Sequence, residues 1–251
     1  MKMTVARTES SSVASSSDGA ALQKYAVIVA GGSGLRAGGG VPKQFRNLGG
    51  RPVVWWAMKA FRDADPSTRI ILVVRKDCLP LWEALFEALP SADRIEHEIA
   101  FGGATRGDSV LSALAMIESR DDVLVAIHDG ARPLVDVQMV SRGWLEGAAS
   151  GACVPCLPCS DSLRRITPGG TEAVSRKDYL AVQTPQIFRA DIIKDAYSCS
   201  EGEFTDDASV AESAGNRVSV YEGSPENIKV TNPGDFAIAR ALLALRGFDK
   251  E

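Results

Sequence analysis

Two kinds of hydrophobic pattern alternate along the chain. Short continuous apolar runs are typical of buried strands, whereas apolar residues spaced three and four apart are typical of helices with one buried face. The predicted strands are Ala26–Val29, Ile70–Val74, Val123–Ile127, Gly151–Val154 and Val218–Tyr221. The predicted helices are Val53–Phe61, Leu79–Leu89, Gly107–Ile117, Val137–Ala149, Ala190–Ser198, Asp206–Ala214 and Pro233–Leu245. Strands that alternate with helices predict a doubly wound α/β fold with a mostly parallel sheet.

Candidate functional residues follow several of the predicted strands directly. A glycine-rich loop begins at Gly31, Arg75 follows the second strand, and His128 and Asp129 follow the third. The chain after Tyr221 follows the fifth. In doubly wound sheets ligands bind beyond the carboxyl ends of the strands, so we expect these segments to share one rim of the sheet.

The loop between Ala30 and Phe45 is the most informative segment of the chain. It contains six glycines and two cations, Arg36 and Lys43. Glycines let backbone N–H groups approach phosphate oxygens closely and adopt positive φ angles. The cations can oppose the negative charge that accumulates when a phosphoryl centre is attacked. The loop therefore predicts a triphosphate site.

Two other glycine-rich motifs fit this loop less well. A P-loop needs its lysine directly after the last glycine and before Ser or Thr, whereas Lys43 stands between Pro42 and Gln44. Residues Gly32–Ala37 match the dinucleotide pattern, but that pattern starts a helix, which Gly38–Pro42 would break. A surface turn without a ligand remains an alternative.

Residues 157–180 interrupt the alternation of strands and helices. This segment is polar and carries the turn sequence Pro168-Gly169-Gly170, which predicts a protruding β-hairpin arm. A lone hairpin is only marginally stable in water, so we expect it to pack on a second subunit. A mobile surface hairpin is the alternative.

Three cysteines, Cys153, Cys156 and Cys159, have the spacing that opens an iron–sulfur ligand run. Leu163 stands where a fourth ligand would fall. The intervening prolines favour extended backbone, in which residues three apart point to opposite faces. We therefore expect reduced thiols that pack as small apolar side chains, as in intracellular proteins.

Composition narrows the class of protein. The chain has 251 residues, an ordinary apolar share of 45% and a net charge of −4, which argues against a nucleic-acid partner. Its apolar runs are shorter than a membrane span requires. Residues 1–24 are rich in serine, and we expect a disordered extension followed by a single domain over residues 25–248. A cytoplasmic location is expected, with the plastid stroma as the alternative if the extension is a transit peptide.

Six motifs in order resemble those of the 2-C-methyl-D-erythritol 4-phosphate cytidylyltransferase family. The resemblance covers nearly the whole chain between Ala26 and Leu245. The motifs are Ala30-Gly-Gly-Ser-Gly-Leu-Arg36 with Pro42-Lys-Gln-Phe45, Gly102-Gly-Ala-Thr-Arg-Gly-Asp-Ser-Val110, His128-Asp-Gly-Ala-Arg-Pro133, Gln183-Thr-Pro-Gln186, Thr205-Asp-Asp-Ala-Ser209 and Glu226-Asn-Ile-Lys-Val-Thr231.

The resemblance implies a Rossmann-like nucleotidyltransferase that joins CTP to a polyol phosphate and releases pyrophosphate. The nucleophile is then a phosphate oxygen that is already an anion at neutral pH, so no general base is needed. Four cations, Arg36, Lys43, Arg176 and Lys229, match positions at which the family opposes negative charge. Mg²⁺ is the implied cofactor.

The matching nucleotide-binding positions are Ala30, Gly31, Gly32, Gly34, Gly103 and Ser109. Ala104 departs from the Asp that some relatives have there, so a side-chain contact to the cytosine amino group is not expected from it. Ser109 has an equally weighted alternative role, which is to satisfy backbone donors at the start of a helix.

The matching acceptor positions are Asp129, Arg132, Thr205 and Lys229, together with Ser162 and Arg176 from the hairpin of a partner subunit. Ser162 replaces the Thr of some relatives and keeps the hydroxyl. Asp129 is also a candidate Mg²⁺ ligand. Thr205 lies in a pattern that also predicts a helix N-terminus, in which Asp207 is assigned a structural role.

The remaining aromatic and histidine residues predict packing. Trp55, Trp56, Trp82 and Trp144 lie in helical patterns, and His97 has no evident partner in the sequence. Two alternatives to the implied activity stay open at this stage: a ribitol 5-phosphate cytidylyltransferase, and an inactive nucleotide-binding scaffold.

Overall fold

The computed structural model describes residues 22–32, 40–200, 202 and 204–248. Residues 1–21 of the predicted extension lie outside this part of the chain. The boundary at residue 24 was placed too late, because Gln23 and Lys24 already belong to the first strand.

All the strands and helices predicted from the hydrophobic pattern are present, with ends that differ by a few residues. The strands are β1 (Gln23–Val29), β2 (Asn47–Leu48), β3 (Arg51–Pro52), β4 (Arg69–Val74), β5 (Glu98–Phe101), β6 (Val123–Asp129), β7 (Ala152–Pro158), β8 (Leu163–Thr167), β9 (Gly170–Val174), β10 (Leu180–Val182), β11 (Gln186–Arg189) and β12 (Ser219–Glu222). The α-helices are α1 (Val53–Ala64), α2 (Leu79–Glu87), α3 (Arg106–Leu114), α4 (Val137–Ser150), α5 (Ala190–Cys199), α6 (Asp207–Ser213) and α7 (Pro233–Leu245).

The central sheet confirms the predicted doubly wound α/β class. Its strand order is β10-β7-β11-β6-β1-β4-β5, with β12 also paired to β7. The pairs β1–β4, β1–β6, β4–β5 and β7–β12 are parallel, so most carboxyl ends point the same way. The short strand β11 runs antiparallel between β6 and β7, and the hydrophobic pattern did not predict it.

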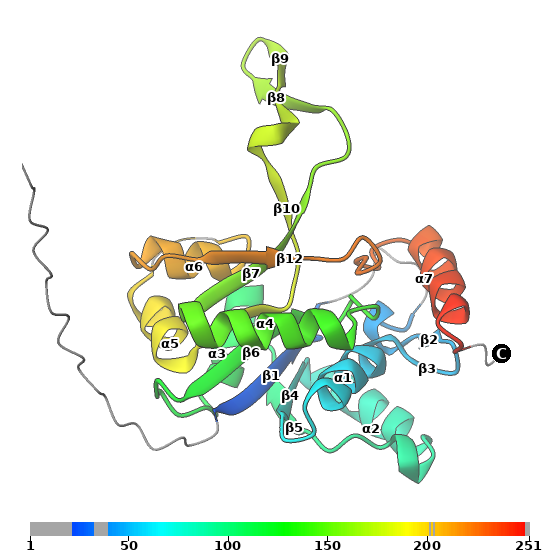
Figure 1. The fold of residues 1–251 in the computed structure, drawn as a ribbon. Helices are drawn as coiled ribbons and strands as arrows, with labels where there is room; N and C mark the ends of the chain where they lie inside the picture. The colour runs from blue at the N-terminus through cyan, green and yellow to red at the C-terminus, as the bar shows by residue number, and fades with distance from the viewer. Residues whose placement is uncertain (1–21, 33–39, 201, 203, 249–251) are drawn as a thin grey trace, which may run out of the picture.

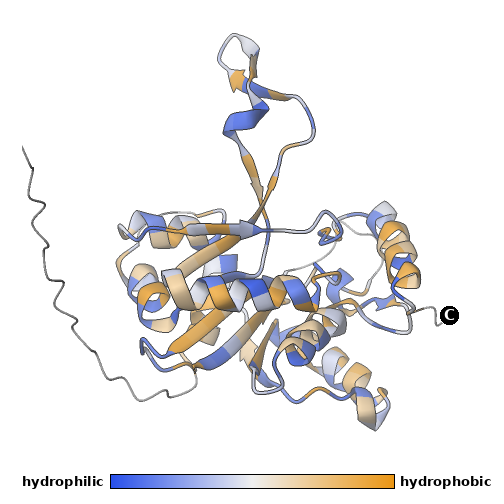
Figure 2. Ribbon diagram, in the orientation of Figure 1, coloured by the Kyte–Doolittle hydropathy of each residue, from blue (hydrophilic) through white to orange (hydrophobic). Residues whose placement is uncertain are grey.

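Each face of the sheet is covered by its own helices (Figure 1). Alternate residues of β1 point to opposite faces: Ile28 belongs to the cluster that includes residues of α1 and α4, and Val27 to the one that includes residues of α3 and α5. Figure 2 shows the inner strands coloured mostly as hydrophobic. All four tryptophans are buried, and their predicted packing role is confirmed.

The predicted hairpin arm is also present and stands away from the sheet (Figure 1). Strands β8 and β9 pair antiparallel from Leu163 opposite Val174 to Thr167 opposite Gly170. Gly170 has a φ angle of 135°, which favours glycine, so the predicted turn residue is required there. Along the arm and its base, apolar side chains remain exposed, including Ile166 at 86% and Leu180 at 51%.

The three closely spaced cysteines lie on or just after β7. The strand is extended, as predicted, and Cys153 and Cys156 pack into different hydrophobic clusters. Burial raises the pKa of both thiols, which keeps them protonated near neutral pH. Within the described residues, the helices are too short or too polar to cross a membrane.

Candidate active site

A cavity of about 800 Å³ opens at the carboxyl ends of β1, β4, β5 and β6. This is the rim at which the sequence predicts a ligand site. The lining residues are Val29, Ala30, Gly31, Gly32, Lys43, Gln44, Arg75, Lys76, Asp77, Gly102, Gly103, Ala104, Thr105, Arg106, Ser109, Asp129, Ala131 and Lys229.

Gln44 fixes the start of the glycine-rich loop. It lies in the short 3₁₀ helix η2 (Lys43–Phe45), and its Nε2 donates to the carbonyls of Ala30 at 2.6 Å and Gly32 at 2.9 Å. This places Lys43, the preceding residue, on the cavity wall. The described glycines of the loop, Gly31, Gly32 and Gly40, do not have the predicted positive φ, and Gly34, Gly38 and Gly39 lie outside the described residues.

Close approach explains the glycines better than backbone angle does. A Cβ atom on Gly31 would lie 3.2 Å from the Ser109 hydroxyl, and one on Gly102 would lie 3.1 Å from the same oxygen. A Cβ on Gly103 would overlap Asp108 at 2.3 Å. The two loops therefore meet at close range across Gly31 and Gly102, where a larger side chain would crowd the Ser109 hydroxyl.

Helix α3 begins beside these glycines with a capping box. The Thr105 hydroxyl accepts from the Asp108 N–H, and the Asp108 carboxylate accepts from the Thr105 N–H. Inside the first turn, Ser109 Oγ accepts from the Gly103 N–H at 3.2 Å and donates to the Thr105 carbonyl at 2.9 Å. Two roles were predicted for Ser109, and in this structure its hydroxyl bonds to nearby backbone groups at the start of α3.

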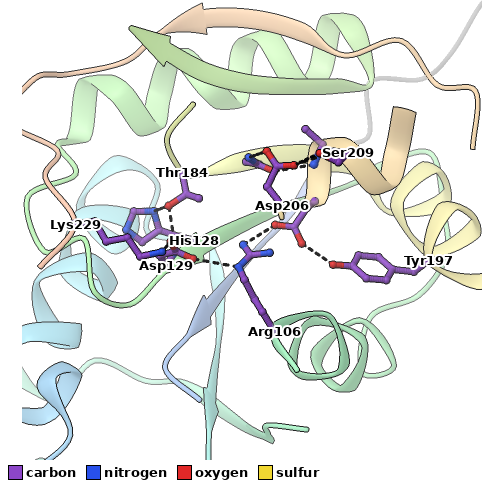
Figure 3. A network of polar contacts seen from close by, with 11 residues as sticks. Arg106, His128, Asp129, Thr184, Tyr197, Asp206, Ser209 and Lys229 are labelled. Carbon is purple, nitrogen blue, oxygen red and sulfur yellow. Dashed lines mark hydrogen bonds and ion pairs between the residues drawn. The ribbon is translucent and has the colours of Figure 1, made fainter. Parts of the chain in front are cut away.

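Asp129 ends β6 at the cavity and holds two cations. Its Oδ2 lies 2.6 Å from Lys229 Nζ, and its Oδ1 lies 3.3 Å from Arg106 Nε (Figure 3). Burial alone would raise the pKa of Asp129, but the charges of Arg106 and Lys229 outweigh burial and hold it well below its ordinary value. Asp129 is therefore an anion throughout the physiological pH range.

A second carboxylate anchors Arg106 from inside the protein. Asp207, which is fully buried in the first turn of α6, lies 2.7 Å from Arg106 Nη2 and accepts from the Tyr197 hydroxyl at 2.7 Å. The adjacent Asp206 caps α6 and accepts from Gln186 at 2.8 Å. The predicted N-terminus of this helix and the structural role of Asp207 are confirmed.

His128 connects the end of β6 to the segment before β11. Its Nε2 lies 3.0 Å from the Arg132 carbonyl, and its Nδ1 lies 3.1 Å from the Thr184 hydroxyl. The same hydroxyl accepts from the Asp129 N–H at 3.1 Å. Burial lowers the pKa of His128 to about 4, so the ring is neutral near pH 7 and donates through Nε2.

The structure brings many of the predicted site residues to the cavity. These are Ala30, Gly31, Gly32, Lys43, Gly103, Ser109, Asp129 and Lys229. Arg36 and Gly34 lie outside the described residues.

Four predicted residues are not among those that line the cavity in the described part of the chain. The Arg132 guanidinium donates to the Asn227 carbonyl at 2.7 Å. Thr205 is exposed just before α6, and Ser162 and Arg176 belong to the arm, where Arg176 donates to the Ser160 carbonyl.

Sequence reasoning assigned no role to Gln44, Arg106 or Thr184, although all three lie inside the quoted motifs. Only their contacts identify them, because each binds a partner far away in sequence. His97 was wrongly described as lacking a partner: its Nε2 accepts from Trp82 Nε1 at 3.0 Å.

The donors at the cavity do not fit a metal ion held by the protein alone. The described residues contain no group of three or more His, Cys, Asp or Glu side chains that could hold one. Asp129, the candidate ligand, has an ion pair on each oxygen, and Asp77 is paired with Arg75. A metal would need most of its ligands from elsewhere.

The family model and the similar proteins of known sequence all indicate the same family. The family model of 2-C-methyl-D-erythritol 4-phosphate cytidylyltransferase matches residues 25–245. A protein of that name from Bacteroides fragilis is 44% identical over 224 residues, which are 88% of this chain and 99% of the relative. Another from Cereibacter sphaeroides is 42% identical over 223 residues, which are 88% of this chain and 96% of the relative.

Solved structures agree with the sequence comparison. The crystal structure of 2-C-methyl-D-erythritol 4-phosphate cytidylyltransferase from Thermus thermophilus is similar with a TM-score of 0.71 and 30% identity, over 88% of this chain and 99% of that one. The crystal structure of 4-diphosphocytidyl-2C-methyl-D-erythritol synthase from Anaerococcus prevotii is similar with a TM-score of 0.74 and 26% identity. The match covers 88% of this chain and 96% of that one.

Proposed function

The chain belongs to the 2-C-methyl-D-erythritol 4-phosphate cytidylyltransferase family, and from this membership we propose how its cavity carries out the reaction. The activity joins CTP to 2-C-methyl-D-erythritol 4-phosphate, giving CDP-methylerythritol and pyrophosphate, in non-mevalonate isoprenoid biosynthesis. The observation that supports the proposal is one cavity that contains backbone-lined glycine loops, Lys43 and the Asp129–Lys229 pair.

The reaction needs alignment and charge rather than proton transfer. A phosphate oxygen of the acceptor attacks the α-phosphorus of CTP, a new P–O bond forms, and the bond to the bridging oxygen of the β-phosphate breaks. Pyrophosphate leaves with the electron pair of that bond. Lys43 and Arg36 oppose the charge that gathers on the α-phosphate oxygens.

CTP occupies the part of the cavity between the two glycine loops. Backbone groups of Ala30, Gly31 and Gly32 bind the nucleotide from one side, and Gly103 and Ser109 from the other. Because Ser109 already bonds local backbone at 3.2 and 2.9 Å, its hydroxyl contacts the ribose only after exchanging one of those partners. Base recognition then depends on backbone groups near Ala104.

The acceptor phosphate binds on the Asp129 side of the cavity. Lys229 is 43% exposed there, which leaves its ammonium accessible to a phosphate oxygen. Arg132 and Thr205 complete the acceptor site after local rearrangement, because neither is among the residues that line the cavity. Asp129 accepts from hydroxyl groups of the polyol.

We propose a homodimer in which the arm of one subunit reaches the cavity of the other. Ser162 and Arg176 would then act in the partner's site. The exposed apolar side chains Ile166, Tyr179, Leu180 and Val182 supply a surface that a second subunit would bury.

Mg²⁺ enters with the nucleotide in this proposal. The triphosphate oxygens supply most of its ligands, which agrees with a cavity that lacks a cluster of carboxylates among the described residues. Bound there, Mg²⁺ would neutralise part of the triphosphate charge. A cytoplasmic location stays a prediction.

Pyrophosphate release in the presence of 2-C-methyl-D-erythritol 4-phosphate and Mg²⁺ tests the choice of nucleotide. We expect CTP to be used and ATP, GTP and UTP to give little turnover. Equal rates with CTP and UTP would mean that the base is not recognised, which would contradict the proposed nucleotide site.

A further inference from the structure

Four charged side chains form a continuous series of ion pairs that runs from α6 to the cavity. They alternate in sign: Asp207, Arg106, Asp129 and Lys229. Two carboxylates face two cations, so the group is neutral overall. In Figure 3, dashed lines join Arg106 to Asp129 on one side and, on the other, to the Asp207 carboxylate, which the Tyr197 hydroxyl also binds.

The side chains at the two ends of this series differ in exposure and in the number of their partners. Asp207 has an exposed side-chain fraction of 0% and is held by both Arg106 and Tyr197, whereas Lys229 is 43% exposed. Arg106 is 29% exposed and binds two carboxylates through different nitrogen atoms of one planar guanidinium. Lys229 can therefore turn to a ligand, whereas Arg106 cannot do so without leaving Asp207 buried and without a charged partner.

This difference matters because Asp129 lies where an anionic acceptor binds. If Lys229 turned to the acceptor phosphate and Asp129 had no other cation, its carboxylate would repel that phosphate. Because Arg106 binds Asp129 Oδ1 and is anchored by Asp207, it would remain there if Lys229 left Oδ2, and the carboxylate would keep both its orientation and a counter-charge.

We propose that Arg106 is a positioning residue of the acceptor site, held by buried Asp207, which fixes Asp129 and so allows Lys229 to bind the acceptor phosphate. This inference rests on the proposed acceptor site at Asp129 and Lys229. It gives Asp207 a second role beyond the structural one, because its carboxylate sets where Arg106 lies.

The test separates positioning from stability and from net charge. Arg106→Gln alone removes a cation and leaves Asp207 buried without a charged partner. The double variant Arg106→Gln/Asp207→Asn restores the neutral balance of the group and replaces the buried ions with amides that can bond each other. The matched control is Arg189→Gln/Asp191→Asn, the same two changes in an ion pair outside the cavity lining.

For the double variant we expect a raised KM for 2-C-methyl-D-erythritol 4-phosphate, by about tenfold or more, with a KM for CTP within about threefold of wild type. Its melting temperature should recover most of what Arg106→Gln alone loses. The control pair should leave both KM values unchanged.

If the double variant recovered both the melting temperature and the wild-type KM for the acceptor, the inference would be overturned. Arg106 would then act only through folding or net charge. An equal rise in both KM values would also overturn it. A wild-type enzyme that does not use this acceptor at all would instead remove the proposed function, so the two failures are distinguishable.

Discussion

At the scale of single residues, charge pairing decides which side chains at the cavity are fixed and which are available to substrates. Asp129 and Arg106 are held on two sides each, whereas Lys229 has one charged partner and a large exposed fraction. A fixed ion pair next to an accessible cation suits a site that must bind phosphate without a general base.

Lys43 carries a direct prediction for the chemical step. The substitution Lys43→Ala should lower kcat about a hundredfold or more, because it removes a cation that opposes charge at the α-phosphate. Pyrophosphate release measures the rate, and circular dichroism checks that the fold is kept. Lys59→Ala, which changes a lysine paired with Asp63 on α1 outside this cavity, is the control. Activity close to wild type in Lys43→Ala would exclude the assigned role.

His128 predicts a dependence of stability on pH. Its pKa is lowered by burial to about 4, from an ordinary value of 6.5, so the unfolded chain binds a proton that the folded chain does not. Stability is therefore fully present above pH 6.5 and is lost as the pH falls toward 4. The free energy of unfolding should drop by about 2 kcal/mol more in wild type than in His128→Gln between pH 7.5 and 5.

Urea unfolding at several pH values measures this difference. Half-buried His97 also has a lowered pKa and is present in both proteins, so its contribution cancels in the comparison. Parallel pH profiles for wild type and His128→Gln would show that the ring is not held neutral by the fold.

At the scale of elements, the hydrophobic pattern predicted the continuous apolar strands and the amphipathic helices well. It missed β11, a strand of only four residues with polar ends, whose antiparallel insertion depends on pairing with β6 and β7. It also missed β5, which is equally short. Strands of four residues carry few side chains from which a period can be recognised, although β12, which has the same length, was predicted.

The candidate site residues could likewise be predicted only in part from the sequence. The rim position of Asp129 and of the glycine loop could be read from the ends of strands. The role of Arg106 could not, because its partner Asp207 lies 101 residues further along the chain. Only the fold brings α3 and α6 close enough for that ion pair to form.

Helix α4 gives a prediction about how closely an element packs on the sheet. A Cβ atom on Gly147 would lie 2.6 Å from Cγ2 of the fully buried Ile187 on β11. Gly147→Ala should therefore destabilise the protein by about 1–3 kcal/mol, despite the better helix propensity of alanine. Urea unfolding measures the change.

The matched control is Gly107→Ala in α3. There the added Cβ would meet its nearest neighbours at 3.7 Å, an ordinary contact, so stability should be kept or slightly increased. Similar effects of the two substitutions would mean that close packing against β11 is not what requires glycine in α4.

At the scale of the whole molecule, the arm predicts that a complete site needs two copies of the chain. Lys43→Ala and Arg176→Ala proteins should each be nearly inactive, since each lacks one cation in every site. In mixed dimers one site combines the intact Lys43 of one subunit with the intact Arg176 of its partner. Random mixing should then restore about a quarter of the wild-type sites.

Co-expression of the two variants with different affinity tags isolates the mixed dimers for assay. Recovered activity in this fraction supports a shared site. Isolated mixed dimers without activity would show that the arm serves its own subunit or no site at all.

The most direct test of the assigned activity is kcat/KM for the acceptor, measured with CTP and Mg²⁺ by pyrophosphate release. We predict that 2-C-methyl-D-erythritol 4-phosphate is preferred over ribitol 5-phosphate by about a hundredfold or more, because the polyol hydroxyls must match the fixed carboxylate of Asp129. A preference for ribitol 5-phosphate would contradict the assignment while leaving the nucleotide chemistry in place.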